Sequence, residues 1–417
     1  MKNIVVCCDG TGNEISENIS NVLKLYRTLR KTGKTQPHQV VFYDPGVGTL
    51  ARPDPWTKFK QDAVAVLGLV TGYGLDDNVL AAYGFLINQY EEGDDIFLFG
   101  FSRGAYTVRV LAGLVHRIGL LSPQQSNLAD AALTAYKQVG LASTPSRANA
   151  PDDFGESDSP APSSKEDRAA QFARIVSSRW PTIKFMGVWD TVASVIVPRP
   201  DRFYAFSLQT LANTRSNPSV RVFRQATAID ERRRMFRLDP WDEPQTFMHN
   251  RFSKTNNAEP QDGKQVWFAG VHADIGGGYP EDESGLSKFP LIWMINEAIE
   301  HGLSVDPRTV NQLAWGVQRK GSPFSYVRPD IMRDPHDSLS AVWRLLEWLP
   351  KSNKYKEWPD RISVLGYYLP KAEPRVIPSD AFIHQSVIDR MAAVPTYRPE
   401  NFPERYRAVE MPSSPEE

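Results

Sequence analysis

Short apolar segments recur along this sequence, and each is followed directly by Asp or Gly. They occupy residues 4–8, 40–43, 96–99, 183–189 and 266–269. A continuous apolar run of this length is too short for a helix and is typical of a strand buried on both faces of a parallel sheet. Between these runs, residues 76–90 and 104–118 carry apolar side chains at helical spacing. Strands that alternate with helices predict an α/β domain in which helices flank a mostly parallel sheet.

A nucleophile motif lies between one such run and the helix that follows it. Residues Gly100 to Gly104 read Gly-Phe-Ser-Arg-Gly, directly after the run at 96–99. A G-x-S-x-G sequence between a strand and a helix is typical of a nucleophile elbow, whose glycines let neighbouring backbones approach closely. We therefore expect the Ser102 hydroxyl and the N–H of Arg103 to face the same space at the carboxyl edge of the sheet. The alternative is a glycine-rich turn with an inert serine.

A serine nucleophile needs a histidine base, and the sequence offers seven histidines. His272 follows the predicted strand at 266–269 and precedes three consecutive glycines at 276–278, so a tightly bent loop can present it. His384 is the second candidate, in a more helical setting that favours a structural role. We predict that His272 is the base.

The base must in turn be oriented by a carboxylate. Asp190 stands at the end of the predicted strand 183–189, and it completes the chain order Ser, Asp, His of α/β-hydrolases. Asp230 is the main competitor, followed by Asp9 and Asp274, and Asp190 itself can be read as a simple cap at the end of a strand. The charge-rich run 230–234 is otherwise typical of a solvated face.

Hydrolysis through an acyl-enzyme also needs two N–H donors for the oxyanion. The N–H of Arg103 is one candidate. The loop after the first predicted strand, Asp-Gly-Thr-Gly-Asn at 9–13, supplies the other, and Gly10 and Thr11 are its candidate donors. The alternative is a plain glycine-rich turn.

Two further segments differ in composition from the α/β part. Residues 142–165 are rich in Pro, Ser and Asp and predict a surface loop or a flap near a site. From about residue 304, prolines divide the chain into short pieces. We therefore expect a catalytic domain over 1–303 and a mostly helical or irregular extension over 304–417 that packs on it or caps it. Three tryptophans and three leucines of the extension form either a membrane-facing patch or a packed helix: Trp343, Trp348, Trp358, Leu345, Leu346 and Leu349.

Charge and cysteine usage restrict the partners. Lys and Arg number 48 against 49 Asp and Glu, and this balance excludes the basic signature of a nucleic-acid-binding protein. The two cysteines, Cys7 and Cys8, are adjacent, which favours a reduced chain.

The apolar part of the N-terminus is shorter than the ~7 to 15 residues of a signal-peptide core. The apolar stretch 63–75 is shorter than the ~18 to 20 residues of a membrane span. We expect a cytoplasmic chain in the producing cell, with no metal and no cofactor.

Five motifs together resemble the catalytic domain of the Tle1-like phospholipase effectors of type VI secretion, the DUF2235 group of α/β-hydrolases. They lie at 8–13, 100–105, 188–192, 228–233 and 267–279. The similarity runs over roughly residues 2–300, with a looser match at 383–387. Gln225 departs from it, because a histidine is expected at that position, and the effectors tend to be longer.

The resemblance implies a lipase site composed of Ser102, Asp190 and His272, cleavage of phospholipid acyl esters and delivery by a secretion system. Peripheral contact with a membrane is part of this expectation. A soluble carboxylesterase acting on small esters and a non-catalytic α/β-hydrolase scaffold are the alternatives. The sequence leaves the oligomeric state open.

Overall fold

The computed structural model of the protein describes most of the chain. The described residues are 1–10, 18–46, 74–142, 164–176, 178–192, 196–198, 206–208, 211–249, 252, 258–353 and 356–413. Thr11 and all but the two ends of the predicted loop 142–165 lie outside these ranges.

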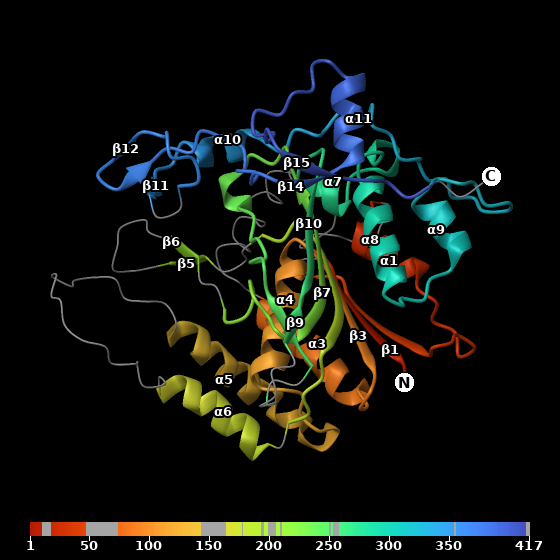
Figure 1. The fold of residues 1–417 in the computed structure, drawn as a ribbon, viewed down its shortest axis with the longest axis vertical. Coiled ribbons are helices and arrows are strands. Elements are labelled where there is room, and N and C mark those ends of the chain that lie inside the picture. Colours follow the sequence, from red (N-terminus) through yellow and green to blue (C-terminus); the bar gives the residue numbers. More distant parts are fainter. Residues whose placement is uncertain are drawn as a thin grey trace.

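An eight-stranded sheet in the order β15-β14-β10-β7-β4-β3-β1-β2 forms the centre of the molecule (Figure 1). Every pair of neighbouring strands is parallel. Its strands are β1 (Asn3–Cys8), β2 (Gln39–Asp44), β3 (Asp95–Phe101), β4 (Ile183–Trp189), β7 (Val220–Ala228), β10 (Asp262–Phe268), β14 (Ala381–His384) and β15 (Tyr406–Val409). The five apolar runs predicted as strands are all in this sheet, which confirms the predicted α/β-hydrolase-like fold.

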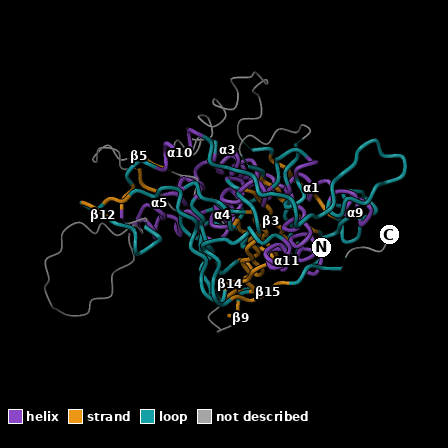
Figure 2. Tube along the Cα trace, turned by 90° about the horizontal axis from the view of Figure 1, so that it is seen from above, coloured by secondary structure: helices purple, strands orange, loops and turns teal. Residues whose placement is uncertain are grey.

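Helices cover both faces of the sheet. The described helices of the chain are α1 (Asn21–Thr28), α3 (Leu75–Gln89), α4 (Arg103–Arg117), α5 (Ala129–Ala142), α6 (Ser164–Ile175), α7 (His272–Gly276), α8 (Lys288–Glu300), α9 (Pro307–Leu313), α10 (Ala341–Glu347) and α11 (Gln385–Ala393). Alternate residues of β1 point to opposite faces, so Ile4 and Val6 pack with α3 to α6, whereas Val5 and Cys7 pack with α1 and α8. Figure 2 shows α4 and α1 on opposite sides of the strands. The central strands β1, β3 and β4 are therefore largely apolar on both faces, as the runs predict, whereas β7 carries buried polar residues.

The segment 304–417 contributes to the sheet as well as covering it. It supplies β14 and β15, and β14 pairs with β10 through Val266 and Trp267. It also contains a small antiparallel sheet of β11 (Lys351–Ser352), β12 (Ser363–Val364) and β13 (Tyr367–Tyr368) beside α10. Figure 1 shows this blue part of the chain along the carboxyl ends of the strands, where α7 follows β10. The division of the chain at residue 303 stays a prediction.

Among the described residues, three small antiparallel sheets lie outside the large sheet. Besides the sheet of β11, β12 and β13, β5 (Ile196–Pro198) pairs with β6 (Phe206–Leu208), and β8 (Thr246–Met248) pairs with β9 (Ala258–Pro260).

The longest described helices, α3 and α4, have 15 residues each. Across the described ranges, no helix combines the length and apolar character that a bilayer span requires.

The predicted tryptophan patch is divided by the fold. Trp348 is 59% exposed, whereas Trp343 is 1% exposed and packs edge-on against Phe236 at 5.3 Å between ring centres. Trp358 is half-buried, and its indole N–H donates to the carbonyl of Pro374 at 2.7 Å. The membrane-facing interpretation is therefore wrong for Trp343, because the apolar side of α10 that carries it packs on the core.

Candidate active site

The turn from β3 into α4 holds Ser102 in a strained backbone conformation. Its φ is 55° and its ψ is −118°, a combination that a non-glycine residue adopts only when the surrounding structure imposes it. The Ser102 N–H donates to the carbonyl of Trp189 at 3.0 Å, which fixes the turn to the end of β4. This is the geometry of a nucleophile elbow, and it leaves the Ser102 side chain partly exposed.

Close contacts require glycine at both ends of the elbow, and the contact differs between the two positions. A Cβ on Gly104 would lie 2.1 Å from the carbonyl oxygen of Cys8 at the end of β1. A Cβ on Gly100 would lie 2.5 Å from the carbonyl oxygen of Gly104. The first turn of α4 therefore packs directly on the backbone of β1, and only glycine fits at either position.

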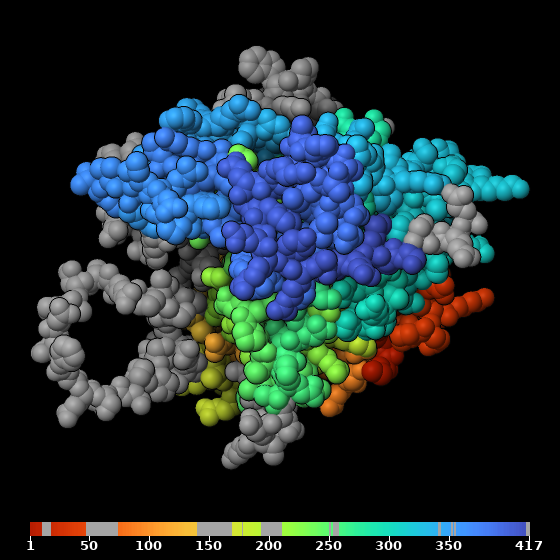
Figure 3. All heavy atoms as spheres, turned by 45° about the horizontal axis from the view of Figure 1, so that its top comes forward, coloured from red at the N-terminus to blue at the C-terminus, as the bar shows by residue number. Residues whose placement is uncertain are grey.

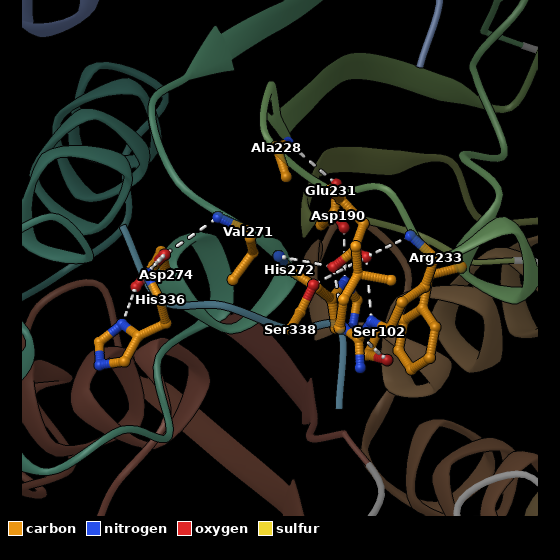
Figure 4. Close-up of polar contacts among 12 residues, drawn as sticks. Ser102, Asp190, Ala228, Glu231, Arg233, Val271, His272, Asp274, His336 and Ser338 are labelled. Carbon is orange, nitrogen blue, oxygen red and sulfur yellow. Dashed lines mark hydrogen bonds and ion pairs between the residues drawn. The ribbon is translucent and has the colours of Figure 1, made fainter. Parts of the chain in front are cut away.

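Three side chains predicted from sequence form one chain of hydrogen bonds (Figure 4). The Nε2 atom of His272 lies 2.8 Å from the Ser102 Oγ, and its Nδ1 lies 2.5 Å from the Asp190 Oδ2. Ser102 follows β3, Asp190 follows β4 and His272 begins α7 after β10, so all three come from the carboxyl edge of the sheet. The arrangement can transfer a proton from the serine hydroxyl to the imidazole while the carboxylate orients the ring.

Aromatic rings surround the His272 imidazole. Phe101 lies 4.8 Å from it in a tilted arrangement, and Phe236 lies 4.9 Å from it edge-on. His272 is 5% exposed, and this burial lowers its pKa below the ordinary value even though the Asp190 carboxylate opposes that shift. The imidazole is therefore neutral, and able to accept a proton, at neutral pH.

Asp190 is held by a residue that the sequence analysis missed. Arg375, in the segment before β14, donates to the Asp190 Oδ1 at 2.6 Å and to its Oδ2 at 3.0 Å. The backbone N–H of Ala228 donates to the same Oδ1 at 3.0 Å. Burial alone raises the pKa of Asp190, but the Arg375 cation and the His272 hydrogen bond outweigh it and hold that pKa below its ordinary range. The carboxylate is therefore ionised in its buried position.

A second buried acid fixes the backbone of the histidine loop. The Glu231 Oε2 accepts from the His272 N–H at 3.2 Å, and both of its oxygens accept from the Arg233 guanidinium at 2.8–2.9 Å. The Ser338 hydroxyl donates to the Oε1 at 3.2 Å. The charged run at 230–234, which is typical of a solvated face, thus contains a buried acid that pairs with the half-buried Arg233 beside the site (Figure 4).

Two of the three candidate oxyanion donors, Arg103 and Gly10, lie within the described residues. Arg103 is the first residue of α4, where an N–H has no acceptor within the helix. The N–H of Gly10 donates to the Asp9 Oδ1 at 2.7 Å, and the other carboxylate oxygen of Asp9 accepts from the Tyr43 hydroxyl at 2.8 Å. The roles of Arg103, Gly10 and Thr11 stay predictions.

The competing candidates belong to other networks. His384 is fully buried and caps α11, where its Nδ1 accepts from the Ser386 N–H at 3.2 Å, and burial lowers its pKa to about 3. The Asp230 carboxylate accepts from the Gly270 N–H and the Tyr397 hydroxyl at 2.7 and 2.8 Å. Asp274 binds the His336 ring at 2.6 Å. These contacts give each group a structural function.

Gln225, the residue that departs from the resembled family, is buried in β7. Its side-chain oxygen accepts a hydrogen bond from Arg109, whose guanidinium lies 3.6 Å from Asp239. A buried arginine thus supplies the polar partner of the amide oxygen. Within the described part of the chain, no three His, Cys, Asp or Glu side chains gather closely enough to bind a metal ion.

Comparison with known proteins adds a family. A family model described as "T6SS, Phospholipase effector Tle1-like, catalytic domain" matches residues 2–297. The uncharacterized protein YEL023C of Saccharomyces cerevisiae is 30% identical over 242 residues, which cover 57% of this chain and 32% of the yeast protein.

Two solved structures are similar at low sequence identity. One is an uncharacterized protein from Pseudomonas aeruginosa, with a TM-score of 0.37 and 18% identity over 74% of this chain and 47% of that chain. The other is the Tle1 effector bound to the VgrG spike of the type 6 secretion system, with a TM-score of 0.31 and 16% identity over 68% of this chain and 52% of that chain. This chain thus spans about a third of the yeast relative and about half of each solved chain.

Proposed function

The chain belongs to the family of Tle1-like phospholipase effector catalytic domains of type VI secretion, and on this basis we propose that it is a serine hydrolase that cleaves acyl esters of phospholipids. Family membership supports a hydrolase of the phospholipase or esterase type in general. The observation that carries the finer proposal is the Ser102–His272–Asp190 chain of hydrogen bonds at a strained elbow. Synthesis in the cytoplasm and delivery by a secretion system are parts of the same proposal.

The geometry supports an acyl-enzyme mechanism. The His272 Nε2 accepts the Ser102 proton while the Ser102 Oγ attacks the acyl carbonyl carbon, and the Arg103 N–H stabilises the oxyanion. The second donor is the N–H of Gly10 or Thr11, and Gly10 can serve only if its N–H leaves its acceptor on Asp9. His272 then donates its proton to the leaving alcohol, and the ester bond of the lipid breaks. A water molecule attacks the acyl-enzyme, gives its proton to His272 and releases the fatty acid, and Ser102 recovers its proton.

A fluorophosphonate probe tests this proposal directly. An activated serine reacts with the phosphorus centre, so we expect stoichiometric labelling that peptide mass spectrometry assigns to Ser102. Ser102→Ala is the matched control and should abolish the label. In parallel, mass spectrometry of a mixed lipid extract should show lysophospholipid and free fatty acid. A folded protein that takes up no label would support a non-catalytic scaffold, and labelling with turnover of small esters only would support a carboxylesterase.

A lobe beside the site supports peripheral contact with a membrane. We call residues 341–373, which comprise α10 and β11 to β13, the α10–β13 lobe; it forms a light-blue projection in Figure 3. At the hairpin between β12 and β13, Leu365 is 93% exposed, and Ile362 is 86% exposed nearby. The end of α10 adds Trp348 and Leu349 at 59% and 48% exposure. Large apolar side chains at such exposure contribute little to the fold, and a group of them on one lobe is typical of an interaction surface.

The hairpin turn itself carries an unfavourable residue. Leu365 and Gly366 have φ values of 51° and 81°, which is the requirement for a type I′ turn. Asn, Asp or Gly meets that requirement, whereas leucine adopts positive φ at a cost. An exposed and strained leucine is unfavourable for the fold, which supports a function for its apolar side chain outside it.

Charge favours an anionic lipid surface as the partner of the lobe. The acids Glu347 and Glu373 are turned inward, at 1% and 4% exposure. Arg344 has a 64% exposed side chain, and the exposed Lys371 lies 5.4 Å from the centre of the Trp348 ring. The lobe thus carries cationic groups beside its exposed apolar side chains, although Arg344 pairs with Asp337 at 3.0 Å, Asp360 is exposed and the whole chain has a net charge of −1.

Vesicle binding tests this contact. We expect Leu365→Asn combined with Ile362→Asn to weaken binding to phosphatidylglycerol-containing vesicles about tenfold or more, because two exposed apolar side chains are lost. Asn is compatible with the turn, so the lobe should stay folded. Ile175→Asn is the matched control, because Ile175 is 77% exposed at the end of α6. Equal binding by all three proteins in a flotation assay would rule out the lobe as the contact.

A further inference from the structure

Arg375 reaches the candidate site from outside the part of the chain that matches the family. The family match ends at residue 297, and the sequence analysis treats 304–417 as a covering extension. The Arg375 guanidinium nevertheless makes a two-point contact with the Asp190 carboxylate, at 2.6 and 3.0 Å. Arg375 is 5% exposed and Asp190 is fully buried. This segment is therefore in direct contact with the proposed acid.

The backbone at Arg375 and just after it is fixed to the end of the sheet. The Asn401 side-chain amide donates to the carbonyl of Arg375 at 3.0 Å and to that of Ile229, just after β7, at 3.1 Å. Ile377 packs in one cluster with Ile229 and Trp267. Arg375 also donates to the carbonyl of Phe236 at 2.7 Å. The guanidinium and its backbone are thus held by contacts that do not involve Asp190.

Each oxygen of Asp190 is shared between Arg375 and another donor. Oδ2 accepts from Arg375 and lies 2.5 Å from the His272 Nδ1, and Oδ1 accepts from Arg375 and from the Ala228 N–H. A planar guanidinium bound to both oxygens sets the rotation of the carboxylate and hence the direction of the lone pair that faces His272. Lysine, with one point of charge, could not set that rotation.

We propose that Arg375 is a positioning residue for the catalytic acid, so that the catalytic site of this protein extends into the segment 304–417. The inference rests on the proposed serine hydrolase function. Arg375 touches neither Ser102 nor a reacting atom in this arrangement; it acts through Asp190 on the orientation and the charge of His272.

The charged groups around the His272 imidazole determine in which direction the loss of Arg375 shifts the pH dependence of activity. Asp190 and Glu231 favour the protonated imidazole, and Arg233 disfavours it. Arg375 faces Asp190 and Glu231, with Glu357 beyond them. Removing the Arg375 cation leaves the Asp190 charge uncompensated, which raises the pKa of His272. Because the base must be neutral to accept the Ser102 proton, the acidic limb of kcat/KM moves to higher pH.

The experiment compares Arg375→Met and Arg375→Lys with the wild type on a soluble p-nitrophenyl ester over a range of pH. We expect Arg375→Met to lower kcat about 10- to 100-fold with little change in KM, and to move the acidic limb to higher pH. Arg375→Lys keeps the charge, so its acidic limb should stay near that of the wild type while kcat falls through the lost two-point contact. Arg405→Met, at a 74% exposed side chain of the same segment, is the matched control.

A second readout does not depend on turnover. NMR titration of the His272 ring should show a higher pKa in Arg375→Met than in the wild type. If Arg375→Met does not fold, Arg375→Lys still tests the inference through its kcat, which should fall while the pKa of His272 stays near that of the wild type. An active, folded Arg375→Met variant with unchanged kcat and an unchanged acidic limb would overturn the inference. An equal loss of kcat in Arg375→Met and Arg375→Lys, with no shift of the acidic limb or of the pKa of His272, would overturn it as well. Failure of the proposed hydrolase function can be distinguished from failure of the inference about Arg375, because in the first case the wild type itself would have no activity.

Discussion

Ser102→Ala is expected to lower kcat on a phospholipid substrate by about 10⁴- to 10⁶-fold, since it removes the nucleophile while the oxyanion donors and the substrate contacts remain. His272→Ala should cause a loss of similar size, because the serine hydroxyl then lacks its proton acceptor at 2.8 Å. Steady-state kinetics on mixed micelles measures both. Circular dichroism should be unchanged for Ser102→Ala, whose side chain is only partly buried.

The double variant gives the sharper test. If Ser102 and His272 act as one unit, the variant lacking both should be no slower than either single variant. Ser386→Ala provides a matched control, because its hydroxyl lies 2.8 Å from the Nδ1 of the buried His384 and forms a second serine–histidine pair in the same molecule. We expect that variant to retain wild-type kcat. Losses that multiply in the double variant, or a large loss in Ser386→Ala, would contradict the assignment.

The strands and the elbow could be predicted from the sequence because their signals are local. A strand buried on both faces by helices is a continuous apolar run, and the elbow combines such a run with two glycines at fixed positions. The candidate residues Ser102, Asp190 and His272 each directly follow or lie near the end of a run. Since the carboxyl ends of parallel strands share one edge, predicting the strands also brought these residues together.

Strand β7 was missed because its polar residues find their partners only in the folded chain. Arg224 interrupts the apolar run, yet it is 3% exposed and bonded to Glu297 at 2.6 Å and to Asp262 at 2.9 Å. Its neighbour Gln225 is equally buried beside Arg109. These partners are distant in sequence, so no periodicity reveals that the strand is central.

Arg375 was missed for the same physical reason. No spacing relates it to Asp190, because the contact depends on β14 joining the sheet next to β10. Trp343 depends on a long-range contact in the same way, because the sequence leaves a membrane-facing patch and a packed helix both open until its contact with Phe236 is known. Contacts between the segment 304–417 and the rest of the chain therefore had to come from the structure.

Two glycine substitutions are expected to have opposite effects on stability. Gly104→Ala places a methyl group 2.1 Å from the Cys8 carbonyl oxygen. The atoms nearest to that methyl group are all backbone, so no flexible side chain can move to relieve the clash. We expect it to lower the free energy of unfolding by about 3 kcal/mol or more. Gly84→Ala, inside α3 with no atom within 4 Å of the added methyl, should raise it by about 0.5–1 kcal/mol because alanine favours the helix.

Urea unfolding measures these changes, and activity separates their causes. In Gly104→Ala, relief of the clash requires the first turn of α4 to move away from β1, which displaces the Ser102 Oγ and the Arg103 N–H together. A displacement of about 1 Å at a reacting group lowers the rate about 100-fold, so residual folded protein should also be nearly inactive. Gly84→Ala should keep full activity. If Gly104→Ala were as stable and as active as the wild type, α4 would not depend on the close contact with β1, and the elbow would tolerate a side chain at its last position.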